Sequence, residues 1–239
     1  MALRAVLFDL DGTLLPMDMD VFLHAYLSRL VGALAAHGYE PKALSRAILG
    51  GTDAMLRNDG RMTNEEVFFT TASALYGQDL RRDTALFDEF YKTEFPRVQT
   101  ACGYQPKAAE LLRFLHERGV RTVLATSPLF PRMATEERMR WAGVSPADFE
   151  LYTTYEDARH AKPNPAYYED VLQACGLSAE ECLMVGNDVS DDMIAATLGM
   201  RVFLLTDCLI NKDGSDIDRY PHGDFDALMA YIRAQLSEQ

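Results

Sequence analysis

Cysteine is scarce in this sequence, and its arrangement indicates no structural site. None of the four cysteines forms a C-x-x-C pair, and no histidine lies at the spacing of a zinc finger. We therefore expect reduced, partly buried thiols. The four residues are Cys102, Cys175, Cys182 and Cys208.

Positive charge and long hydrophobic runs are also lacking. The net charge is −13, which argues against a surface that binds nucleic acid or acidic membranes. No apolar run approaches the length of a membrane span, and the sequence opens directly into a predicted strand, without the order of a signal peptide. We expect a cytoplasmic protein in which a local cation attracts any anionic substrate.

What the sequence does contain is enough apolar residues, 48% of 239, for a buried core. A strand is predicted at residues 5–8, and from about residue 99 helices and strands alternate. Such βα units imply a parallel sheet with helices on both faces, so the predicted fold class is α/β with a doubly wound sheet. The later strands are predicted at residues 120–126, 149–154, 182–185 and 201–205, and the helices at 106–118, 132–142, 164–175, 191–198 and 225–236.

Residues 16–98 have a different pattern, with apolar residues at helical spacing and no convincing strand. A block of about eighty residues is too long for a βα connection. We interpret it as a helical cap domain inserted into a core domain made of residues 1–15 and 99–239. The Gly50-Gly51 and Asn58-Asp-Gly60 stretches are predicted to be turns with positive φ. Predicted helices of the insert cover residues 21–37, 42–49, 65–75 and 84–94.

The first predicted strand ends in two carboxylates, Asp9 and Asp11. Side chains alternate along a strand, so both would point to the same side. Two carboxylates this close need a cation, a shared proton or strong hydrogen bonds, which is the usual preparation for acid/base or metal chemistry. An acidic turn would also contain Asp and Gly, so this stretch alone does not decide between a site and a turn.

Three more polar clusters fall where a doubly wound sheet brings its loops together. One carboxylate can attack phosphorus, a second can protonate the leaving oxygen, and Mg²⁺ can offset the repulsion between carboxylate and phosphate. Hydroxyl groups, backbone amides and a lysine can bind the remaining phosphoryl oxygens. The clusters are Thr126-Ser127, Lys162, and Gly186-Asn187-Asp188 with Asp191 and Asp192.

This ordered set resembles the four motifs of the haloacid dehalogenase (HAD) superfamily, over roughly residues 3 to 205. The helical insert resembles the C1 cap of its phosphoglycolate phosphatase and β-phosphoglucomutase members. Two positions depart from the usual motifs: Asn187 separates Gly186 from the first aspartate, and Ser127-Pro128 stands where many relatives have Thr-Asn and a basic residue. The matching residues are Asp9-x-Asp11-Gly-Thr13, Thr126, Lys162-Pro163 and Gly186-Asn-Asp188-x-x-x-Asp192.

The resemblance implies a role for each of these residues. Asp9 would be the nucleophile and a Mg²⁺ ligand, and Asp11 the general acid and base, with its carbonyl on the metal. Thr126 and the Ser127 backbone would bind the phosphoryl group, and Lys162 would neutralise the charge of nucleophile and phosphate. Asp188 would ligate Mg²⁺, and Asp192 would support the metal site or Lys162, although Asp191 could take either aspartate's role.

The resulting prediction is a Mg²⁺-dependent phosphatase that acts on a small phosphorylated metabolite through an aspartyl-phosphate. A haloacid dehalogenase would also use Asp9, but it needs no metal and no acid, so Asp11 and Asp188 argue against it. A phosphomutase would keep every motif, so the sequence does not exclude it. A phosphate-binding regulatory module would be expected to have lost at least one motif residue, and the intact set argues against it. The sequence indicates neither the substrate nor the oligomeric state.

Overall fold

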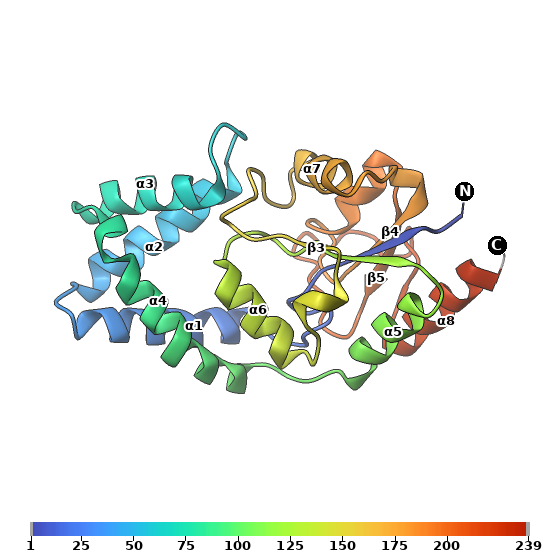
Figure 1. The fold of residues 1–239 in the computed structure, drawn as a ribbon, viewed down its shortest axis with the longest axis horizontal. Helices are drawn as coiled ribbons and strands as arrows, with labels where there is room; N and C mark the ends of the chain where they lie inside the picture. Colours follow the sequence, from blue (N-terminus) through green and yellow to red (C-terminus); the bar gives the residue numbers. More distant parts are fainter. Residues whose placement is uncertain (1, 238–239) are drawn as a thin grey trace.

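The computed structural model describes residues 2–237 and contains a six-stranded parallel sheet (Figure 1). The strand order is β3-β2-β1-β4-β5-β6, so β1 lies between β2 and β4 inside the sheet. The predicted α/β, doubly wound fold is confirmed. The strands are β1 (Ala5–Phe8), β2 (Arg121–Leu124), β3 (Leu151–Tyr152), β4 (Cys182–Gly186), β5 (Arg201–Leu205) and β6 (His222–Gly223).

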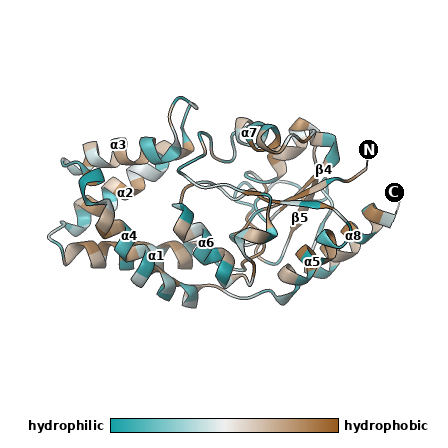
Figure 2. Cartoon of the chain, viewed as in Figure 1, coloured by the Kyte–Doolittle hydropathy of each residue, from teal (hydrophilic) through white to brown (hydrophobic). Residues whose placement is uncertain are grey.

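Side chains alternate along each strand, so both faces of this sheet are apolar, and helices cover both. Val6 and Phe8 of β1 pack into one buried cluster, and Ala5 and Leu7 pack into the other. Figure 2 shows hydrophobic residues on β4 and β5, with hydrophilic residues distributed over the surrounding helices. The first cluster includes α5 (Pro106–His116), α6 (Arg132–Trp141) and α8 (Phe225–Ser237), and the second includes α7 (Pro165–Cys175) and the 3₁₀ helix η5 (Met193–Leu198).

Three elements differ from the sequence prediction. The strand predicted at 149–154 is reduced to the two residues of β3, which pair with β2 alone. The helix predicted at 191–198 is the 3₁₀ helix η5, which begins two residues later because backbone amides of the preceding loop bond to aspartate side chains instead. The short β6 was not predicted. Two further 3₁₀ helices lie in connections, η3 (Pro146–Asp148) and η4 (Ala179–Glu181).

Between β1 and α5 the described chain forms helices and no strand. These helices extend to one side of the sheet, at the left in Figure 1. The chain enters and leaves this region through adjacent segments, since Met17 pairs with Cys102 and the Gly103 N–H donates to the Pro16 carbonyl at 2.7 Å. That residues 16–98 are a separate domain remains a prediction. The helices are α1 (Met19–Ala35), α2 (Pro41–Leu56), α3 (Asn64–Tyr76), η1 (Leu80–Asp83), α4 (Thr84–Thr93) and η2 (Phe95–Ala101).

Nowhere in residues 2–237 is a helix long and apolar enough to cross a membrane.

The turn predicted at Gly50-Gly51 is wrong. Both glycines lie inside α2, and neither has a positive φ. A Cβ atom at Gly51 would lie 2.7 Å from the Phe68 ring and 3.1 Å from the Phe68 carbonyl of α3. The missing side chain therefore lets two helices approach closely. The turn predicted at Gly60 is confirmed, with φ of +87°.

Phe95 lies at the centre of an aromatic cluster that joins the inserted helices to α6. Its ring is fully buried and lies 5.9 Å from Tyr26 of α1 and 5.1 Å from Trp141 of α6. It also contacts Phe130 at 6.5 Å, in the segment that precedes α6. Such ring pairs add to the free energy gained from burying apolar area.

Replacing Phe95 with Ala should lower the free energy of unfolding by about 3–5 kcal/mol, because it leaves a cavity among these rings. Urea unfolding would measure the change. Tyr104 is 62% exposed, and the matched change Tyr104→Ala should stay within about 0.5 kcal/mol. An unchanged urea midpoint for Phe95→Ala would contradict this assignment of the cluster.

Candidate active site

The site is built at the carboxyl ends of the three central strands. Phe8 of β1 lies opposite Leu124 of β2 and Val185 of β4. The Asp9 N–H donates to the Val185 carbonyl at 2.9 Å, which extends the pairing by one residue. The residues that follow each strand therefore meet at one edge of the sheet, as parallel strands require.

Lys162 connects two aspartates from different loops. Its side chain is buried, and Nζ donates to Asp9 Oδ1 at 2.9 Å and to Asp192 Oδ1 at 2.6 Å. Burial alone would lower the pKa of this amine, but the two carboxylates outweigh burial and raise the pKa well above its usual value. Lys162 is therefore a permanent cation between two buried acids.

Asp192 also orders the loop after β4. Its Oδ2 accepts a hydrogen bond from the Asp188 N–H at 2.9 Å, so both of its oxygens have protein donors. A Cβ atom at Gly186 would overlap the Asp192 carboxylate. Glycine is needed at this position because the carboxylate packs directly on the backbone.

Asn187, which interrupts the expected motif, has a structural role. It is buried, accepts a hydrogen bond from Thr13 Oγ1 at 2.9 Å and donates to the Cys208 carbonyl at 2.7 Å. Gly12 has a φ of +85°, and a Cβ atom there would overlap the Asn187 amide. Thr13 Oγ1 also lies 3.3 Å from Asp9 Oδ2, and its one proton can go to either Asn187 or Asp9.

The loop after β2 places Thr126 and Ser127 at the same edge. The Thr126 carbonyl accepts hydrogen bonds from Tyr167 Oη at 2.9 Å and Thr153 Oγ1 at 2.5 Å, which fix its backbone. Ser127 Oγ is buried and has no hydrogen-bond partner. Such atoms are uncommon because an unpaired buried polar group costs about 1–3 kcal/mol.

Asp11 is not in the Lys162 cluster but pairs with Arg138, a residue that the sequence interpretation missed. Arg138 Nη1 donates to Asp11 Oδ2, and Asp11 Oδ1 is buried without a partner. Burial raises the pKa of the Asp11 carboxyl, and the Arg138 guanidinium acts in the opposite direction. The sequence signal was the position of Arg138 on the same face of α6 as the buried Ala134 and Trp141.

Asp188 and Asp191 lie in the loop after β4 and are less buried. Asp188 Oδ1 accepts hydrogen bonds from the Ser190 and Asp191 N–H groups at 2.7 and 3.0 Å. Burial, and then the charge of Asp188, raise the pKa of Asp191 to about 6. Across residues 2–237 there is no group of three or more His, Cys, Asp or Glu side chains that could hold a metal ion.

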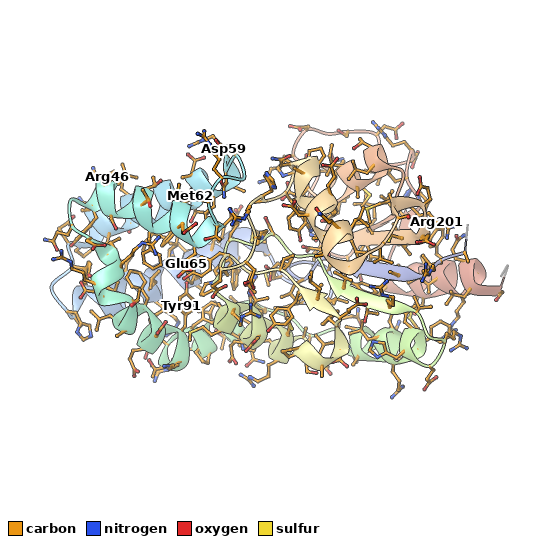
Figure 3. The ribbon with its side chains drawn as sticks, turned by 45° about the horizontal axis from the view of Figure 1, so that its top comes forward. Arg46, Asp59, Met62, Glu65, Tyr91 and Arg201 are labelled. Atoms are coloured by element: carbon orange, nitrogen blue, oxygen red, sulfur yellow. The ribbon has the colours of Figure 1, made fainter. Side chains whose placement is uncertain are left out.

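The inserted helices reach the loops of the site through Asn64, at the start of α3. Its side chain is fully buried, and Nδ2 donates to the Pro128 carbonyl at 3.1 Å and to the His160 carbonyl at 3.3 Å. The next residue, Glu65, donates its N–H to the Tyr155 carbonyl at 2.8 Å. Figure 3 labels Glu65, in the first turn of α3, and Met62, in the segment that precedes this helix.

Known proteins are similar to this chain over most of its length. A phosphoglycolate phosphatase from Vibrio parahaemolyticus is 28% identical over 206 residues, which cover 85% of this chain and 84% of that protein. The pyrophosphatase PpaX of Anoxybacillus flavithermus is 25% identical over 84% of this chain and 82% of its own length.

Solved structures show the same fold. A 2-haloacid dehalogenase from Pseudomonas syringae pv. Tomato superposes with a TM-score of 0.64 at 20% identity, over 98% of this chain and 99% of its own. The family model that describes haloacid dehalogenase-like hydrolases matches residues 3–199. With most of its length matched, the chain belongs to the haloacid dehalogenase-like hydrolase family.

Proposed function

We propose that this protein is a Mg²⁺-dependent phosphatase that hydrolyses a small phosphomonoester through a phosphorylated Asp9. The observation that carries the proposal is the environment of the Asp9 carboxylate at the end of β1. One oxygen accepts a hydrogen bond from the Lys162 ammonium at 2.9 Å, and the other lies 3.3 Å from the Thr13 hydroxyl. These two contacts hold the carboxylate in one orientation at the end of β1, as an attacking nucleophile needs.

In the first step an Asp9 oxygen attacks phosphorus and forms an acyl phosphate. The ester P–O bond breaks, its electron pair stays on the leaving oxygen, and that oxygen takes the proton of Asp11 to leave as an alcohol. In the second step water attacks phosphorus and gives its proton to the Asp11 carboxylate. The bond between phosphorus and Asp9 breaks, which releases inorganic phosphate and restores both side chains.

Binding of the phosphoryl group falls to the loop after β2 and to Lys162. Ser127 Oγ is a buried hydroxyl without a partner, and a phosphoryl oxygen would satisfy it. We assign Thr126 and the Ser127 backbone to the same group. The Lys162 ammonium supplies the local cation that a protein of net charge −13 needs to bind an anion.

The oxygen donors at this edge fit Mg²⁺, which binds a few carboxylate or carbonyl oxygens and completes its shell with water. We propose the carboxylates of Asp9 and Asp188 and the carbonyl of Asp11 as ligands. Asp192 was also predicted to support the metal, but both of its oxygens have protein donors, which favours orientation of Lys162 and of the Asp188 loop. When bound, the ion would offset the repulsion between carboxylate and phosphate.

We propose residues 16–98 as a cap that excludes bulk water from the site. Asn64 donates to the Pro128 carbonyl, in the loop after β2, and to the His160 carbonyl, in the loop that leads to Lys162. These two contacts support this role. The names of the two relatives, a phosphoglycolate phosphatase and a pyrophosphatase, favour a small phosphorylated substrate. Dehalogenation needs no proton for its halide, so the buried Asp11 favours phosphate transfer over that chemistry.

Replacing Asp9 with Asn should lower phosphate release by about 10³-fold or more, because the amide cannot attack phosphorus. The assay is a panel of phosphoglycolate, pyrophosphate, sugar phosphates and p-nitrophenyl phosphate, with chromatography of the sugar phosphates to detect isomerisation by a mutase. Asp53→Asn, an exposed change on α2, is the control and should keep the wild-type rate. A comparable rate in Asp9→Asn would rule out the covalent mechanism.

Removal of divalent metal by excess EDTA should abolish release, and added Mg²⁺ should restore it. Asp188→Asn should raise the Mg²⁺ concentration for half-maximal rate by at least about tenfold, because it removes a charged ligand. The matched change Asp191→Asn should leave that concentration nearly unchanged. The reverse pattern in Mg²⁺ titrations would assign the ligand to Asp191.

A further inference from the structure

Arg138 is a charged residue buried where a charge is costly. Its side chain is 0% exposed, and an arginine remains charged even when buried. Within residues 2–237, Asp11 is the one carboxylate paired with it. The pair connects α6 to the loop after β1, at the proposed general acid.

The guanidinium is held on several sides. Nη2 donates to Thr135 Oγ1 at 3.3 Å and Nε donates to the Ala134 carbonyl at 3.3 Å, both on its own helix. Its carbon lies 4.3 Å from the centre of the Phe130 ring, which belongs to the aromatic cluster around Phe95. A planar group fixed by hydrogen bonds and a ring face can orient whatever binds its remaining N–H groups.

The two oxygens of Asp11 have unequal surroundings. Oδ2 accepts from Arg138, whereas Oδ1 is buried and has no partner. A carboxylic acid that donates a proton needs one oxygen to carry that proton and the other to act only as an acceptor. Because Oδ2 accepts from Arg138, it acts as the acceptor, and Oδ1 is left to carry the proton.

We infer that Arg138 is a positioning residue, which holds Asp11 by Oδ2 so that Oδ1 exchanges the proton with the leaving group and with water. The inference rests on the proposed function and adds a residue to its machinery. Stability does not explain the pair well, because buried ion pairs are often no more stabilising than apolar side chains of similar volume.

This role predicts an effect that depends on the leaving group. An alkoxide needs a proton as it departs, whereas p-nitrophenolate leaves without one, so formation of the aspartyl-phosphate depends on a well-placed Asp11 only for the alkyl ester. The later attack of water uses Asp11 with both esters, but kcat/KM depends only on the steps up to departure of the leaving group. A residue that merely supports the fold, or that binds the phosphoryl group, would lower kcat/KM of both esters alike.

The experiment compares kcat/KM of the full chain with p-nitrophenyl phosphate and with the best alkyl phosphate of the panel above. Arg138→Met should lower kcat/KM for the alkyl ester by about 100-fold and for the aryl ester by less than about threefold. Arg138→Lys should recover part of the alkyl rate. Arg140→Met, on the same helix but with an exposed side chain, should match wild type on both substrates.

Equal losses of kcat/KM on the two substrates would overturn the inference. Arg138→Met leaves Asp11 without its partner and can unfold the chain, so the pair is also tested with Asp11 neutralised. In an Asp11→Asn background, adding Arg138→Met should cost less than about twofold more on the alkyl ester, because the two residues act as a unit. A further tenfold loss would overturn it. A wild-type chain that releases no phosphate from any panel member would instead refute the proposed function, and the inference with it.

Discussion

The ion pairs of one lysine hold this site together. Two buried carboxylates, on Asp9 and Asp192, lie within hydrogen-bonding distance of the Lys162 ammonium. The ammonium offsets the repulsion between these two negative charges. Because Asp192 also accepts the Asp188 N–H, the charge that keeps Asp9 ready to react fixes the shape of the loop after β4 as well.

The sheet makes that arrangement rigid. All four residues of β1 are fully buried, and its register with β2 and β4 leaves no freedom for the position of Asp9. Burying charged side chains costs free energy of folding. Burial of the two apolar clusters on the faces of the sheet contributes the stabilisation that offsets this cost. The buried carboxylates of Asp9 and Asp192 lie beyond the strand ends, where the loops can be polar.

The sequence predicted the parts of the molecule that follow from local pattern. Asp9, Lys162 and Asp192 were assigned to one site because each follows a strand or opens a helix at a recognisable spacing, and the structure brings them together. Arg138 was missed because one arginine in a helix normally faces solvent, and its partner is 127 residues away. The glycines of α2 were misread because a glycine needed for close helix packing looks the same in sequence as one needed for a turn.

The contacts of Asn187 have a consequence for how the site forms in time. Its amide joins Thr13, which is 174 residues away in sequence, to the carbonyl of Cys208, 21 residues further along. Contacts between such distant segments require closure of long loops, which makes them slow to form during folding. These contacts join the segments that follow β1, β4 and β5, so the surroundings of Asp9 come together only when those three strands lie in one sheet.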